Sequence, residues 1–455
     1  MEVSMPALKN RHILLLFLLL SLLYGLTFAT VLGDLAASMQ AGDWKELSTQ
    51  GYVVSGTPIL AVNGSSGGGS MTEYSDKGVW NPITKEVWFY GGSHCGSGCG
   101  CPGSDKIIRY SLSTNTWSTI ANSGQGCGHT YEQDAIDPAT GIFYNRSYSG
   151  STINQFTTQA GAWSTLTTIP ANVWRPQSTC CAALEYSPEM KGLVIVGGGQ
   201  PFGGGGAIGF YSLVSNQWRQ LASNLTMGAY SNICGYSSAN HLVYFGGGSP
   251  DFYKMDSSGL ITKLANAPIT VSTSTTSVGT TDPVTGDYLV IGNSGGFYAF
   301  SFTANAWRLI SNNPPAYAAG QGSQVQIFCS PVPDAGVVMF GTYNFANSKV
   351  YIYKHAAGGA SGEKNALLPF VSDQGIGVSP NPFSAKTCIT VAANFEIYSA
   401  QVFDPAGKLV QTLAWPRGKS WNSMAWDAGH LPSGVYLISL HGGDRMIRKY
   451  VTLLK

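Results

Sequence analysis

The chain has 455 residues, a formal net charge of +1 and only 11% charged residues, where about a quarter is usual in soluble domains. Its 57 glycines and 12% aromatic residues are typical of an all-β extracellular protein, and they exclude a disordered chain, which would lack the aromatic residues. The near-zero net charge excludes electrostatic attraction to nucleic acid or to an acidic membrane surface.

The N-terminal segment predicts a signal peptide over residues 1–29. Basic residues precede an apolar run from Ile13 to Phe28, and small residues follow at Thr27 and Ala29, as a cleavage site requires. An uncleaved membrane anchor is the alternative, because the run can be extended toward the roughly 20 residues that span a bilayer. In both cases the rest of the chain lies outside the cytoplasm, and no later segment predicts a membrane span.

Internal repeats fill the central part of the chain. Five units carry a Trp, or an Ile in its place, followed three residues later by Leu or Ile, and four of them have an aromatic residue seven positions earlier. An apolar strand that ends in glycine precedes this pattern in most units. The repeated positions are Trp117, Trp163, Trp218, Ile261 and Trp307, at intervals of 46, 55, 43 and 46 residues.

Each unit is interpreted as a four-stranded antiparallel blade, with glycine where the backbone bends or approaches another strand closely. The sequence therefore predicts a six-bladed β-propeller over residues 40–356. The second unit lacks the glycine and reads "IFYNRS" instead. The sixth unit has no Trp strand, whereas an additional copy, "DWKELS" with Trp44, precedes the first unit. We therefore expect the strand of Trp44 to complete the last blade.

The double glycine, the spaced aromatic residue and the Trp together resemble the kelch repeat and the galactose oxidase-like superfamily. This resemblance implies a kelch-like propeller in which glycine and tryptophan serve folding rather than chemistry.

Nine cysteines in an exported chain indicate disulfides first. The candidates are Cys95, Cys99, Cys101, Cys127, Cys180 and Cys181. With His94 and His129 the first four also offer the residue types of a metal site, but their spacing matches no familiar ligand pattern. The expectation is therefore disulfides and neither a metal nor a cofactor, with at least one thiol unpaired because nine is odd.

Catalytic candidates occur in the stretch "CGHTYEQD", predicted as the first strand of the second blade. Alternation would place His129 and Tyr131 on one face, and Glu132 and Asp134 on the other. Two carboxylates facing a cleft could hydrolyse a glycosidic bond. Some kelch-like propellers are copper-radical oxidases, so an extracellular carbohydrate-active or oxidase-type enzyme is one hypothesis. The other assignment is that these polar groups only line a wet channel.

The preferred hypothesis is binding, because loops on a rigid propeller can carry recognition residues without disturbing the blades. Trp174, Arg175 and Phe202 lie in aromatic and polar loops suited to a glycan or a partner protein. Simple packing of Trp174 is the competing explanation, and a propeller that serves only as a spacer is a third possibility.

A small-residue linker is predicted over 357–375, and an immunoglobulin-like β-sandwich over 376–455, from about seven short alternating segments separated by turns. The tail contains the motif residues Pro380, Asn381, Pro382, Phe383, Gly407, Asp427, Gly434, Val435, Tyr436 and Lys455. Together they resemble the C-terminal sorting domain of type IX secretion cargo. The resemblance implies recognition by the type IX secretion machinery, and a secreted or outer-membrane surface-attached protein after transit through the periplasm.

Overall fold

The structure is a computed structural model of the chain, which separates into two compact units, Met1–Asn365 and Ala366–Lys455. The residues that it describes are 30–62, 69–92, 105–120, 130–146, 150–157, 161–173, 182–197, 205–228, 231–272, 276–320, 326–356, 376–391, 399–404, 409–413, 423–442 and 445–455. The predicted signal peptide and the predicted linker lie outside these residues.

The described part of the first unit contains six four-stranded antiparallel sheets, numbered here sheet 1 to sheet 6 in chain order. In sheets 1 to 5 four consecutive strands pair in sequence order. The strands of sheets 1 to 3 are β4 (Gly78–Asn81), β5 (Glu86–Gly92), β6 (Asp105–Ser111), β7 (Thr116–Ile120), β8 (Asp134–Ile136), β9 (Phe143–Arg146), β10 (Thr152–Thr157), β11 (Ala162–Thr168), β12 (Ala183–Ser187), β13 (Gly192–Gly197), β14 (Gly206–Ser212) and β15 (Gln217–Leu225). Those of sheets 4 and 5 are β16 (Asn232–Ser237), β17 (Leu242–Gly247), β18 (Phe252–Met255), β19 (Ile261–Lys263), β20 (Ser277–Thr281), β21 (Tyr288–Gly292), β22 (Gly296–Ser301) and β23 (Ala306–Asn312).

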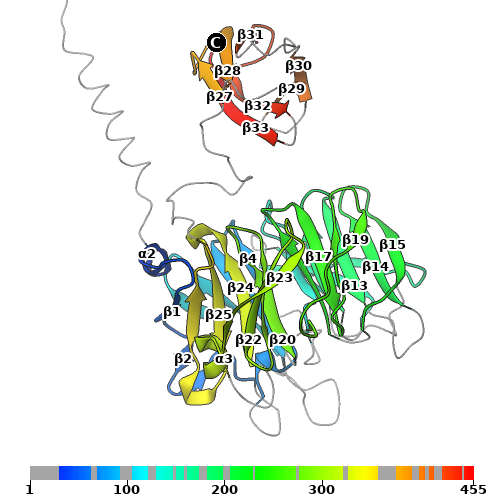
Figure 1. The fold of residues 1–455 in the computed structure, drawn as a ribbon, viewed down its shortest axis with the longest axis vertical. Coiled ribbons are helices and arrows are strands. Elements are labelled where there is room, and N and C mark those ends of the chain that lie inside the picture. The colour runs from blue at the N-terminus through cyan, green and yellow to red at the C-terminus, as the bar shows by residue number, and fades with distance from the viewer. Residues whose placement is uncertain are drawn as a thin grey trace, which may run out of the picture. The chain divides into compact units, whose positions relative to one another are not determined.

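Sheet 6 joins the two ends of the first unit. Its order is β1-β26-β25-β24, so its outer strand comes from the N-terminal side of the chain, and Trp44 pairs with Tyr353. The blue β1 lies beside the yellow strands of this sheet (Figure 1). The strands are β1 (Trp44–Glu46), β24 (Ile327–Val332), β25 (Val337–Thr342) and β26 (Val350–Tyr353).

The first strands of the six sheets form a closed ring. Along the chain β4 contacts β8, β8 contacts β12, β12 contacts β16, β16 contacts β20, β20 contacts β24, and β24 returns to β4. The unit is therefore all-β and has the arrangement of a β-propeller-like fold (Figure 1). Its smaller elements are α2 (Val31–Ala37), α3 (Pro315–Ala319), the 3-10 turns η1 (Met71–Glu73), η3 (Pro333–Ala335) and η4 (Phe345–Asn347), and the hairpin of β2 (Val53–Val54) and β3 (Thr57–Pro58).

The repeated aromatic residues account for the outer half of the sheets. The aromatic residue seven positions before each Trp packs against it, with ring centroids 5.2 Å apart for Tyr110 and Trp117 and 4.9 Å apart for Phe300 and Trp307. The Trp117 ring also contacts Phe328 of sheet 6 at 5.9 Å. The recurring seven-residue spacing thus brings two adjacent strands together, and Trp117 also reaches the neighbouring sheet.

A left-handed turn makes this register possible. Asn115 and Asn216, each two residues before a repeated Trp, have φ of 55°, a conformation that asparagine tolerates better than most residues. The hydroxyl of Tyr110 donates a hydrogen bond to Asn115 Oδ1 at 2.9 Å. The same bond recurs between Tyr211 and Asn216 at 3.2 Å.

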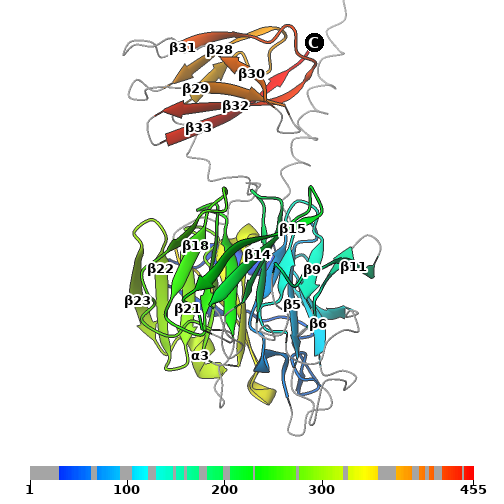
Figure 2. The ribbon, with the colours of Figure 1, turned by 90° about the vertical axis from the view of Figure 1, so that its right-hand side faces the viewer.

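The second unit contains two antiparallel sheets over one core. The three-stranded sheet has the order β27-β28-β31 and the four-stranded sheet the order β30-β29-β32-β33 (Figure 2). Phe383, Ile389, Trp426 and Ile438 belong to the core that both sheets share. The strands are β27 (Ile376–Ser379), β28 (Lys386–Val391), β29 (Ser399–Phe403), β30 (Leu409–Leu413), β31 (Ser423–Asp427), β32 (Gly434–Gly442) and β33 (Arg445–Leu453).

Across the described residues of both units, the structure contains no helix with the length and apolar character that a membrane crossing requires.

Candidate functional site

Charged side chains gather where the first strands of the sheets meet. This group, called the central cluster here, consists of Asp76 and Lys77 before β4, Glu132 and Asp134 at the start of β8, and Glu185 of β12. Asp76, Lys77, Glu132 and Asp134 are at most 8% exposed. The cluster has four carboxyl groups and one ammonium group, an unusual charge balance for a buried site.

Lys77 connects three sheets. Its Nζ donates hydrogen bonds to the carbonyl oxygen of Leu184 at 2.6 Å and to that of Cys234 at 3.0 Å. It also forms an ion pair with Glu185 Oε2 at 3.1 Å. These three contacts account for the three N–H donors of an ammonium group. Burial alone would lower the pKa of Lys77, but Glu185, Asp134 and Glu132 raise it above its usual value, so the side chain stays charged.

Glu132 and Asp134 share this surrounding but not the same partners. Glu132 Oε2 accepts a hydrogen bond from the backbone N–H of Cys234 at 2.8 Å. Neither carboxylate oxygen of Asp134 accepts one from another described residue. Burial raises the pKa of Asp134 to about 8, against the lowering effect of Lys77. Burial, reinforced by Asp76, also raises the pKa of Glu132.

The stretch predicted as a single catalytic strand is interrupted. Tyr131 has φ of 47°, so regular strand geometry begins only at Asp134. The Tyr131 ring packs against Tyr74 with centroids 6.2 Å apart. Glu132 and Asp134 do reach the same cluster, but it is buried, and Lys77 rather than a cleft lies beside them. His129 lies outside the described residues.

The other sequence candidates of the first unit also lie outside the described residues. They are Trp174, Arg175, Phe202, Cys95, Cys99, Cys101, Cys127, Cys180 and Cys181. The three remaining cysteines, Cys234, Cys329 and Cys388, are free thiols. No group of three or more His, Cys, Asp or Glu side chains is placed to hold a metal ion within the ranges that the structure describes.

Sequence reasoning missed Lys77 and Glu185, which complete the central cluster. Their only signal is position: "SDKGVW" and "ALEYS" enter or form the first strand of a unit, as "YEQDAI" does. A comparison of first strands between units could have found them, because charged residues are rare in this chain.

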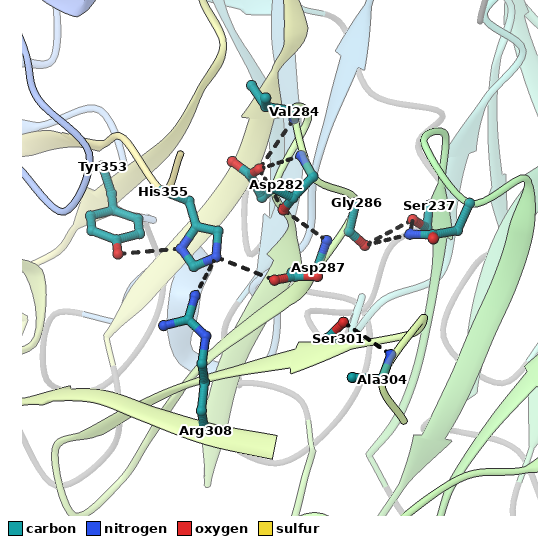
Figure 3. Close-up of polar contacts among 12 residues, drawn as sticks. Ser237, Asp282, Val284, Gly286, Asp287, Ser301, Ala304, Arg308, Tyr353 and His355 are labelled. Atoms are coloured by element: carbon teal, nitrogen blue, oxygen red, sulfur yellow. Dashed lines mark hydrogen bonds and ion pairs between the residues drawn. The ribbon is translucent and has the colours of Figure 1, made fainter. Parts of the chain in front are cut away.

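A second polar network joins sheets 5 and 6 through His355, which follows β26. Arg308 donates to His355 Nε2 at 2.8 Å, and the Tyr353 hydroxyl lies 3.3 Å from Nδ1 (Figure 3). Asp287 lies 3.4 Å from Nε2. These contacts connect the end of β26 in sheet 6 to sheet 5.

The residues 380–383, called the tail motif here, contact the last strand of the second unit, β33. Asn381 Oδ1 accepts a hydrogen bond from the backbone N–H of Thr452 at 2.8 Å. Phe383 is buried, pairs with Leu453, and packs on Trp426 with centroids 5.3 Å apart. Strand β27 ends at Ser379, and Pro380 follows it outside the strand. The tail motif therefore connects β33 with β31.

The other tail residues support the same end of the unit. Tyr436 donates its hydroxyl to the carbonyl of Pro432 at 2.8 Å, and Lys455 Nζ donates to the carbonyl of Gly429 at 2.6 Å. Asp427 pairs with Lys386 at 3.2 Å on the surface. Gly434 and Val435 begin β32, and Gly407 lies outside the described residues.

Comparison with known proteins identifies the tail. Residues 377–453 match the family model described as the secretion system C-terminal sorting domain. No curated protein matches the chain. The sorting domain indicates handling by the type IX secretion system, secretion, and attachment at the cell surface.

Two solved structures resemble the chain distantly. A chain of a nidogen/laminin complex is 8% identical with a TM-score of 0.39, over 64% of this chain and 91% of that one. PorZ of Porphyromonas gingivalis, described as an essential bacterial surface component of its type IX secretion system, is 12% identical with a TM-score of 0.35, over 84% of this chain and 60% of its own. Neither likeness carries an argument about function.

Proposed function

We propose that this protein is a surface-delivered binding module, in which the tail is the export address and the first unit recognises a glycan or a protein outside the cell. The observation that carries the proposal is the match of residues 377–453 to the sorting domain. A chain with this address acts outside the cell, so the ring of sheets is the part available for recognition.

We further propose that sheets 1 to 6 are the six blades of a kelch-type propeller over residues 40–356, and that residues 376–455 form an immunoglobulin-like sandwich. The recurring Trp, its stacked aromatic partner and the closed ring of first strands support the first assignment. Seven strands in two antiparallel sheets over one core support the second.

The burial and the hydrogen bonding of the two candidate carboxyl groups favour a binding function over hydrolysis. Glu132 and Asp134 are 3% and 2% exposed, whereas an acid–base pair must reach the bond that it cleaves. One of them is held by a backbone N–H, and both lie beside an ammonium group. The cluster therefore serves better to hold three sheets together than to meet a substrate.

The recognition surface is proposed on the loops that precede the first strands and follow the second strands. Trp174, Arg175 and Phe202 belong to such loops by their place in the sequence. Among the described residues, Phe345 follows β25, is 55% exposed and has φ of 35°. A strained, exposed aromatic residue is a feature of binding surfaces, and its ring packs on Tyr343 at 5.2 Å.

The test is a glycan array probed with the full secreted protein, with Trp174→Ala, Phe202→Ala and Phe345→Ala as variants. The proposal predicts selective binding that at least one of these variants weakens while the melting temperature stays unchanged. A matched control is Val214→Ala, an exposed apolar residue in the turn between β14 and β15. Catalytic turnover of a bound glycan, abolished by Glu132→Gln, would overturn the binding assignment in favour of an enzyme.

A further inference from the structure

The seam between sheet 1 and sheet 2 changes from apolar to polar along its length. At one level Trp88 of sheet 1 packs on Phe143 and Phe156 of sheet 2, with centroids 5.5 and 5.7 Å away. Two residues farther along each strand, on the same face, sheet 2 presents Asp134, Asn145 and Asn154. Asp134 opposes Asn145 and Asn145 opposes Asn154 in the register of β8, β9 and β10. We call these three residues the polar row.

Asn145 of the polar row occupies a position that is apolar in the other five sheets. Asn145 lies two residues after Phe143, which opposes the spaced aromatic residue Phe156. In the second strand or its equivalent of each other sheet, the residue at the position of Asn145 is apolar and buried. These residues are Phe89, Ile195, Phe245, Val290 and Phe340. The polar residues of sheet 2 are therefore a local departure from the repeat rather than a general property of the ring.

The polar row is buried and short of partners. Asp134, Asn145 and Asn154 are 2%, 0% and 3% exposed. Four of their atoms, Asp134 Oδ1 and Oδ2, Asn145 Oδ1 and Asn154 Nδ2, have no hydrogen-bond partner among the described residues. Leaving a buried polar atom unpaired is costly. The amide of Asn154 can also turn over to present its oxygen, since the two amide atoms have nearly the same shape.

Lys77 cannot supply the missing partner. Its three donors are used by Leu184, Cys234 and Glu185. The seam thus contains at least three oxygen atoms, two from Asp134 and one from Asn145, that have no hydrogen-bond partner among the described residues.

We propose that the polar row binds a calcium-class divalent cation between sheets 1 and 2. Carboxylate and amide oxygens, completed by water, are the ligands of Ca²⁺, whose coordination geometry is flexible. Mg²⁺ fits less well, because it dehydrates reluctantly and requires a near-ideal octahedron. The site needs one carboxylate and two amides, so it differs from a cluster of three acidic or His and Cys ligands, and it departs from the metal-free expectation drawn from the sequence.

The test uses the full secreted protein after dialysis against EDTA. Calorimetric titration should show one Ca²⁺ bound per chain and little response to Mg²⁺, and Ca²⁺ should raise the melting temperature of the first unit. Asn145→Leu, which restores the residue type of the other sheets, should fold and lose the response. Asp134→Asn should weaken Ca²⁺ binding by roughly 10-fold or more.

A matched control is Asp334→Asn, which changes an exposed carboxylate of η3 that pairs with Lys85 at 2.7 Å. It should leave Ca²⁺ binding unchanged. Absence of any Ca²⁺ response in the unmodified protein would overturn the proposal and assign the polar row to buried water. Ca²⁺ binding by Asn145→Leu and Asp134→Asn as tight as that of the unmodified protein would also overturn the proposal, because the ion would then bind elsewhere.

Discussion

Asp134 and Glu132 show how two buried carboxyl groups, two residues apart, acquire different roles. The backbone N–H of Cys234 satisfies Glu132, whereas Asp134 has no such partner among the described residues. Without a bound ion, Asp134 therefore remains protonated over much of the pH range in the folded state.

The metal-free protein should become less stable as the pH rises from about 4 to about 8. The pKa of Asp134 is raised from 3.8 to about 8 by burial, so between these values the unfolded chain has released a proton that the folded chain still holds. Stability falls with pH wherever the unfolded state binds fewer protons. Melting temperatures measured in EDTA across this range should show the fall, and Asp134→Asn should flatten it. An unchanged slope in the variant would contradict the assignment.

Removing the ammonium group of the central cluster should be strongly destabilising. Lys77→Met leaves Glu185 buried without its counter-charge, and breaking a buried pair on one side costs about 3–5 kcal/mol. The control is Lys85→Met, because Lys85 is 48% exposed and pairs with Asp334 at the surface, where such pairs contribute about 0–1 kcal/mol. Urea unfolding gives both values. Equal losses in the two variants would show that the central cluster contributes no more than a surface pair.

For the strands, the spacing of aromatic residues predicted the pairing, whereas the positions of charged residues did not. The Trp pattern indicates which strands pair because Tyr110 and Trp117, or Phe300 and Trp307, must face each other across a turn. The pattern carries no information on groups that meet across sheets, so Lys77 and Glu185 were missed. Helix α2 was also missed, because its seven residues follow the apolar run without a break in composition.

The strand of Trp44 should be essential for the ring. Its ring packs against Phe297, Phe340 and Tyr353 with centroids 5.4, 4.9 and 4.7 Å away. Trp44→Ala should lower the free energy of unfolding by about 3–5 kcal/mol, while Lys45→Ala, an exposed change on the same strand, should have little effect. If a chain beginning at Gly51 unfolds as cooperatively as one beginning at Thr30, β1 does not close the ring.

Reducing agent should lower the melting temperature of the first unit. Cys234, Cys329 and Cys388 are free, which leaves six of the nine cysteines, an even number, as the predicted disulfide partners. Closing a loop of about 15 residues is worth on the order of 3 kcal/mol in the chain-entropy model. Calorimetry with and without dithiothreitol measures the change, and an unaltered melting temperature would argue against disulfides.

For the whole molecule, the tail decides where the first unit acts. Deleting residues 376–455 in a bacterium that has the type IX machinery should leave a folded ring in the periplasm, as fractionation and protease accessibility would show. Phe383→Ala, which removes the contact with Trp426, should reduce surface delivery in proportion to the loss of tail folding. Lys386→Ala, an exposed change on β28, is the control. Normal surface delivery without the tail would show that the tail does not direct export.

The pairing of Trp44 with Tyr353 also imposes an order in time. Strand β1 is the first strand of this unit to be made and β26 is the last, and at roughly 5–20 residues per second the ribosome needs about 15–60 s to deliver the partner. Until then β1 has no partner strand, and the growing chain presents unpaired strand edges that promote aggregation. The ring can therefore close only once synthesis has passed β26, its last strand.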